Sequence, residues 1–129
     1  MLKWKRHLRG CGVGEERLRT GLRETYAYHR ATEQMMSRVL ADARDHPVMA
    51  PYHEYWRQAV KTLVVGWPAR GRQRTLLRAG IALALSFDTW HTLTGEQGLT
   101  DKEALELVLR LVRADGEAVR SGEREASAS

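Results

Sequence analysis

Apolar residues recur at helical spacing along most of the chain, and the longest such run covers residues 75–93, TLLRAGIALALSFDTWHTL. Its apolar side chains fall almost all the way around a helical wheel, with Arg78, Thr89 and Thr92 on a narrow polar strip. A helix with this pattern is normally covered on two sides by other elements. We therefore predict one central helix over Thr75–Leu93, starting near Gln73, inside an all-α domain.

Two helices are predicted before residue 45. The first covers residues 15–30. Thr32 is placed to cap a second helix, which ends near Ala43. The alternative is one continuous helix that bends near Ala31. Asp45-His46-Pro47 ends this segment, because the residue before a proline disfavours helical backbone.

A further helix is predicted to begin at Pro51, since proline suits a first helical turn. Its apolar stripe is Tyr52, Trp56, Ala59, Val60, Leu63 and Val64, and its solvent side is His53, Glu54, Arg57, Gln58 and Lys61. Gly66, Pro68 and Gly71 end it in a short loop.

The last predicted helix begins at Thr100 and Glu103, which have the T-x-x-E spacing of a capping box. Gly95 is placed to cap the end of the central helix before it. The central helix and the last helix form a terminal hairpin, and both are apolar on two faces. One face can fill the domain's own core, and we expect the other to pair with a second copy in an intermolecular four-helix bundle. The predicted fold is an all-α, antiparallel bundle of about five helices.

Charge distinguishes the ends of the chain from its centre. Residues 1–14 carry four basic and no acidic side chains, and we interpret them as an irregular basic leader. Residues 115–129 are read as a disordered polar tail. Between them, residues 15–114 carry 15 basic and 12 acidic side chains, so we expect no DNA binding from this domain.

Cysteine content and the N-terminal sequence indicate a cytoplasmic protein. The single cysteine, Cys11, excludes an intramolecular disulfide and a cysteine-based zinc site. Residues 1–10 are charged but no apolar stretch follows them, so no secretory signal is expected. Asp88 lies inside the most apolar run, which argues against a membrane-spanning helix.

Most of the chain resembles the C-terminal effector-binding and dimerisation domain of TetR-family transcriptional regulators. The resemblance covers residues 15–114 and lies in the order and lengths of the helices, the apolar terminal hairpin, and the runs LRETYAYHRATEQMMSRVLADA, LLRAGIALALSFDTWHTL and GLTDKEALELVLRLV. It implies a homodimer through the last two helices and, in each subunit, a pocket for a small apolar or aromatic effector. The helix-turn-helix of that family has no counterpart in MLKWKRHLRGCGVG, so direct operator binding is not expected.

Candidate residues for these two surfaces come from the apolar faces of helices expected to meet. Large aromatic side chains with polar atoms, and an adaptable methionine, suit a pocket for a flat organic ligand, and ordinary core packing is the alternative for each. The candidate pocket residues are Tyr26, His29, Met36, Trp56, Trp67, Phe87, Asp88 and Trp90. The candidate dimer interface consists of Leu83, Phe87, His91, Leu105, Val108, Leu109 and Val112.

Asp88 and His91 stand three residues apart in the most apolar run. A buried carboxylate is costly without a partner, so we expect Asp88 to meet His91, Arg78 or a polar group of a ligand. It could serve as a structural pair at the dimer seam or in ligand recognition.

His29 and Glu33 could begin a metal site in a helical bundle, but neither Glu-x-x-His repeats nor His-x-x-x-His are present. The chain also lacks a nucleophile–base set and a phosphate-binding loop. We therefore expect no enzyme activity, metal or cofactor. The predicted function is a dimerising regulatory domain that binds a small molecule; the alternatives are a metal-binding helical-bundle enzyme and a dimerisation module without a ligand.

Overall fold

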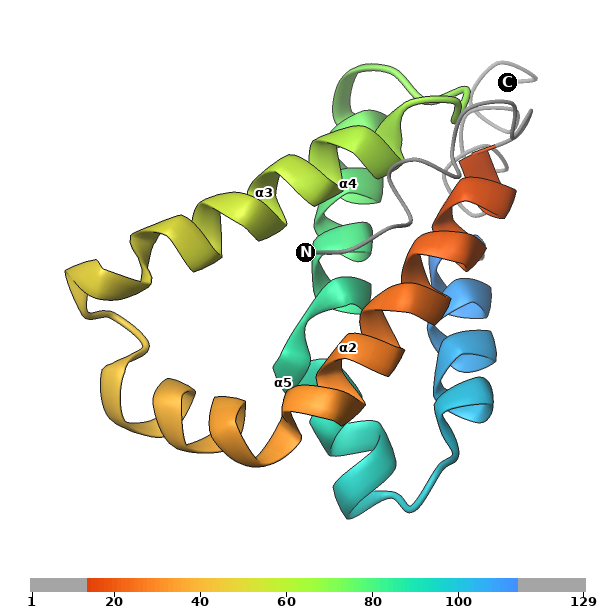
Figure 1. The fold of residues 1–129 in the computed structure, drawn as a ribbon. Helices are drawn as coiled ribbons and strands as arrows, with labels where there is room; N and C mark the ends of the chain where they lie inside the picture. The colour runs from red at the N-terminus through yellow and green to blue at the C-terminus, as the bar shows by residue number, and fades with distance from the viewer. Residues whose placement is uncertain (1–13, 114–129) are drawn as a thin grey trace.

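A computed structural model describes residues 14–113, which form five α-helices joined by short connections (Figure 1). The helices are α2 (Gly14–Ala43), α3 (Ala50–Val64), α4 (Gly71–Leu85), α5 (Phe87–His91) and a C-terminal helix over residues 101–113; a 3₁₀ helix, η1 (Pro47–Met49), precedes α3, and a π-helical turn, η2 (Thr92–Glu96), follows α5. The described part of the chain contains no strand, which confirms the all-α prediction. The predicted leader and tail lie outside the described residues, apart from Gly14, which begins α2.

A single long helix, α2, replaces the two helices predicted over residues 15–43. Thr32 lies inside it, and its hydroxyl donates a hydrogen bond to the carbonyl of Tyr28 at 2.9 Å. A threonine bonded to the carbonyl four residues earlier is compatible with a helix and often bends it. In Figure 1 the second half of α2 turns away from the direction of the first. The predicted N-cap at Thr32 is therefore wrong.

The predicted central helix over Thr75–Leu93 is also wrong, because the chain breaks at Ser86. This residue is extended (φ −60°, ψ 136°), and its Oγ accepts a hydrogen bond from the backbone N–H of Asp88 at 3.2 Å, which caps the start of α5. Helical hydropathy alone does not reveal such a break, since apolar residues continue on both sides of it.

The connection from α5 to the C-terminal helix ends later than predicted. The π-helical turn η2 carries the chain past Gly95 to Gln97, and the backbone reverses at Gly98, whose φ is +71°. Gly95 is thus not the helix cap. The predicted capping box is confirmed: the backbone N–H of Glu103 donates to the Thr100 hydroxyl at 3.1 Å, and the Thr100 N–H donates to the Glu103 carboxylate at 3.0 Å.

The core lies where α2, α3, α4, α5 and the C-terminal helix meet, and its largest fully buried side chains include Trp90, Tyr26, Leu18, Leu22, Leu63, Ile81 and Leu109. Three ion pairs, Glu15–Arg113, Arg19–Glu106 and Arg30–Asp101, join α2 to the C-terminal helix in opposite residue order. The two helices are therefore antiparallel. Among residues 14–113, no helix combines the length and the apolar character needed to span a membrane.

Candidate ligand-binding site

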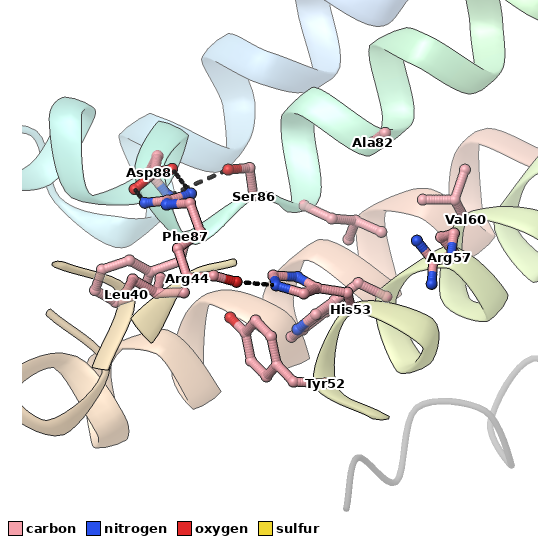
Figure 2. Close-up of a pocket in the computed structure, with 12 residues that line it drawn as sticks. Leu40, Arg44, Tyr52, His53, Arg57, Val60, Ala82, Ser86, Phe87 and Asp88 are labelled. Carbon is pink, nitrogen blue, oxygen red and sulfur yellow. Dashed lines mark hydrogen bonds and ion pairs between the residues drawn. The ribbon is translucent and has the colours of Figure 1, made fainter. Parts of the chain in front are cut away.

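A cavity of about 320 Å³ lies between the end of α2, one side of α3 and the α4–α5 junction (Figure 2). Its lining residues are Leu40, Arg44, Tyr52, His53, Trp56, Arg57, Val60, Ala82, Leu85, Ser86, Phe87 and Asp88. Small-molecule sites typically measure about 300–1,000 Å³, so the cavity suits a ligand of modest size.

Buried apolar side chains form one part of the lining. Leu40, Val60, Leu85 and Phe87 belong to the hydrophobic core and contribute to the cavity from four different helices, α2, α3, α4 and α5. Trp56 is half-buried beside them and adds an aromatic surface. This part of the cavity can hold the apolar body of a ligand by removing it from water.

A charged pair forms another part of the lining. Arg44, in the turn after α2, donates from its two terminal nitrogens to both carboxylate oxygens of Asp88, at 2.7 and 3.0 Å. The Arg44 guanidinium lowers the pKa of Asp88, mainly through this hydrogen bond. On the other side, Nε2 of His53 lies 2.8 Å from the backbone carbonyl of Arg44. Figure 2 shows Arg44 held at both ends, by His53 at its backbone and by Asp88 at its guanidinium.

Two further polar side chains reach the cavity from α3. Burial raises the pKa of Tyr52 further above its ordinary value of 10.0, and its protonated hydroxyl can donate a hydrogen bond. Arg57 is exposed, and its Nε donates to Glu54 at 2.9 Å. The charged side chains that line the cavity are thus two arginines and one aspartate.

Three of the eight predicted pocket residues line this cavity: Trp56, Phe87 and Asp88. Tyr26, His29, Met36 and Trp90 are instead buried in the core, and Trp67 packs against the start of α2, where a Cβ on Gly14 would overlap its ring.

His29 lies directly behind the cavity lining. Its ring centroid is 5.4 Å from that of Phe87 and 5.5 Å from that of Trp56. Trp90 is anchored away from the cavity, because its indole N–H donates to Asp101 at 3.0 Å and the Arg30 guanidinium lies over its ring.

The prediction that Asp88 is buried is wrong. Its side chain is 56% exposed because the break at Ser86 places it in the first turn of a new helix. Its partner is Arg44 rather than His91 or Arg78. His91 instead stacks on Phe87, with ring centroids 5.5 Å apart.

Most of the polar cavity residues were not predicted from the sequence. His53 and Arg57 were predicted on the solvent side of their helix, and no role was predicted for Arg44. Tyr52 and Val60 were on the predicted apolar stripe of α3, and that stripe was the available signal for this side of the cavity. The contribution of Ser86 required knowledge of the helix break.

The predicted dimer-interface residues are mostly buried within one chain. Phe87, Leu105, Val108, Leu109 and Val112 all belong to its hydrophobic core, so they are not available to a second copy. Of the predicted set, Leu83 is 64% exposed and His91 is half-buried.

His29 and Glu33 were the two residues considered as the start of a metal site. His29 is buried and bonded to a backbone carbonyl, whereas Glu33 pairs with Arg30 at 3.5 Å. Across the described residues, no group of three or more His, Cys, Asp or Glu side chains is placed to hold a metal ion.

Comparison of the chain with protein-family models, curated proteins and solved structures finds no match. The cavity and its lining are therefore the observations from which a function can be inferred.

Proposed function

We propose that residues 14–113 form a small-molecule-binding, dimerising regulatory domain like the C-terminal domain of TetR-family regulators. The observation that carries this proposal is the cavity of about 320 Å³ with a buried apolar lining and a few convergent polar groups. That combination is typical of sites for small organic ligands.

The position of the cavity supports a regulatory role. Its lining comes from the end of α2, from α3, and from α4 and α5 on either side of Ser86, so one ligand would contact four helices at once. A ligand shifts a conformational equilibrium when it binds one arrangement of these elements better than another. A bound effector could therefore alter how α5 sits against the end of α2.

A dimer through α4 and the C-terminal helix is the second part of the proposal. Each of these helices exposes a large leucine, Leu83 at 64% and Leu111 at 59%. The helices are close neighbours, since a Cβ on Gly80 would lie 3.8 Å from Cγ2 of Val112. Covering such leucines against a second copy would remove apolar surface from water.

Ligand binding can be tested by filling the cavity. Ala82 lines it and is exposed, so Ala82→Trp should occupy the space without overpacking the core. Small apolar and aromatic compounds that raise the melting temperature of the wild type should lose this effect in Ala82→Trp. The matched control is Ala79→Trp, an exposed position on the same helix outside the cavity. Compounds that stabilise both variants equally would place the binding elsewhere and contradict the proposal.

The dimer can be tested by light scattering coupled to size exclusion. We expect a wild-type mass of twice the 14.7 kDa of one chain and a folded monomer for Leu83→Glu. Val65→Glu, at an exposed apolar position after α3, should remain dimeric. A monomeric wild type would contradict the dimer and leave the ligand-binding part intact. A dimer that binds no compound would correspond to a dimerisation module without a ligand.

A further inference from the structure

We propose that the ligand of this cavity is an amphipathic carboxylate, an apolar or aromatic body with one carboxylate that binds Arg44 in place of Asp88. The inference rests on the proposed function, because it requires that the cavity bind a small molecule. It adds the chemical class of that molecule and the side chain that recognises it.

The charged groups and hydrogen-bond donors of the cavity lining favour an anionic ligand. Arg44 and Arg57 bring two permanent positive charges to the cavity lining, which contains one carboxylate, that of Asp88; the partner of Arg57, Glu54, lies outside the lining. Tyr52 and Ser86 add hydroxyl groups that can donate. A cationic ligand would meet two arginines, whereas an anion would meet a surplus of donors.

The geometry of Arg44 suits a carboxylate. Its guanidinium already holds a carboxylate through two parallel hydrogen bonds to Asp88, at 2.7 and 3.0 Å. This two-bond arrangement is the one that arginine uses to recognise carboxylates. Because His53 also holds the backbone carbonyl of Arg44, the arginine is positioned from both ends before a ligand arrives.

The existing partner of Arg44 can be exchanged for a ligand. The side chains of Arg44 and Asp88 are 46% and 56% exposed. Ion pairs with this exposure contribute little to stability, since water can solvate each partner alone. A ligand carboxylate can therefore replace Asp88 at small cost, and the released Asp88 remains accessible to water.

The apolar body of the ligand has a defined place next to this arginine. Leu40 and Phe87 lie beside Arg44 in Figure 2 and are both buried core residues. Phe87 and Trp56 provide aromatic surface for a planar group. The modest volume suits a body of about one or two rings.

The exchange would also break a link between two elements. Arg44 follows the end of α2, and Asp88 lies in the first turn of α5, so their ion pair joins the two directly. A ligand carboxylate on Arg44 would release α5 from this contact. The Arg44–Asp88 ion pair is therefore the contact through which ligand binding would change the proposed regulatory domain.

The test uses three probes with the same aromatic body and different head groups: naphthylacetate, naphthylethanol and naphthylethylamine. Their affinities for the wild type are measured by isothermal titration calorimetry at neutral pH. We expect naphthylacetate to bind about tenfold more tightly than the alcohol, because its bonds to Arg44 form beside the buried Leu40 and Phe87, where water weakens them less than it weakens those of the exposed Asp88. The amine should bind most weakly.

Two substitutions should move the affinity for naphthylacetate in opposite directions. Arg44→Gln should weaken it about tenfold and leave naphthylethanol unchanged. Asp88→Asn should strengthen it several-fold, because the competing carboxylate is gone. Arg38→Gln is the control; it removes the same charge from an exposed position on α2 outside the cavity and should change neither affinity.

The outcomes separate this inference from the proposed function. If the alcohol binds as tightly as naphthylacetate, or the amine binds best, the cavity is a ligand site but its ligand is not an anion. Unchanged naphthylacetate affinity in both Arg44→Gln and Asp88→Asn would also overturn the inference. If none of the probes binds the wild type or Asp88→Asn, both the inference and ligand binding at this cavity are contradicted.

Discussion

Nε2 of His29, on α2, lies 2.8 Å from the backbone carbonyl of Leu85, the last residue of α4. A carbonyl only accepts hydrogen bonds, so Nε2 carries the proton and Nδ1 is the unprotonated nitrogen. One turn earlier on α2, the Tyr26 hydroxyl donates to the carbonyl of Ala84 at 2.6 Å. The two side chains thus satisfy carbonyls that the helix break at Ser86 leaves without helical partners. Since Leu85 also lines the cavity, these bonds help to fix the position of its lining.

Replacing Tyr26 by phenylalanine should reduce the free energy of unfolding by about 1–2 kcal/mol, because a buried carbonyl loses its donor. The ring itself is retained, so core packing is unchanged. Urea unfolding of the variant measures the effect, and Tyr28→Phe, on the same helix but less buried, should change stability much less. Equal effects at the two positions would show that the bond to Ala84 does not stabilise the break.

His29 should make stability depend on pH. Burial lowers its pKa below the ordinary value of 6.5, so the folded protein holds it neutral while the unfolded chain binds a proton more readily. Its contribution is therefore complete above pH 6.5 and is lost as the pH falls from there toward the folded-state pKa. Urea unfolding of wild type and His29→Gln over this range measures the difference between them, in which the other histidines cancel. We expect that difference to shrink with acid; a constant difference would contradict the prediction.

Two helical glycines should respond oppositely to alanine. A Cβ on Gly21 would lie 3.1 Å from both terminal carbons of Leu63, which is fully buried and cannot easily move aside. We expect Gly21→Ala to destabilise the protein by about 1 kcal/mol, since overpacking outweighs the gain in helix propensity.

At Gly80 the new Cβ would meet only Val112, at 3.8 Å, an ordinary contact. Gly80→Ala should therefore stabilise by about 0.5–1 kcal/mol. Thermal unfolding of the two variants compares them directly. A stabilised Gly21→Ala would mean that Leu63 repacks freely.

The capping box should stabilise the C-terminal helix through the Thr100 hydroxyl. Thr100→Ala removes the acceptor for the N–H of Glu103 and should cost about 1 kcal/mol of unfolding free energy. Thr100→Ser keeps the hydroxyl and should stay close to the wild type. Chemical denaturation of both variants makes the comparison, and equal loss in the two would point to the methyl group instead of the hydrogen bond.

The number of helices was predicted correctly for the wrong reasons. Two predicted helices are joined in α2, and the predicted central helix is divided at Ser86. Thr32 and Ser86 have similar hydroxyl side chains, yet one bonds back within a helix and the other caps a new one. Local hydropathy does not distinguish a hydroxyl that bonds back within a helix from one that caps a new helix, because serine and threonine can make either hydrogen bond.

The sequence by itself determined the features that depend on neighbouring residues: the all-α class, the apolar stripe of α3, the start of that helix near Pro51, and the capping box of Thr100 and Glu103. Each of these follows from side chains within about one helical turn of one another. The tertiary structure alone decided where α4 ends and what lines the cavity. Tyr26 and Ala84, His29 and Leu85, and Arg44 and Asp88 are 58, 56 and 44 residues apart, so only the packing of α2 against the α4–α5 junction brings them together.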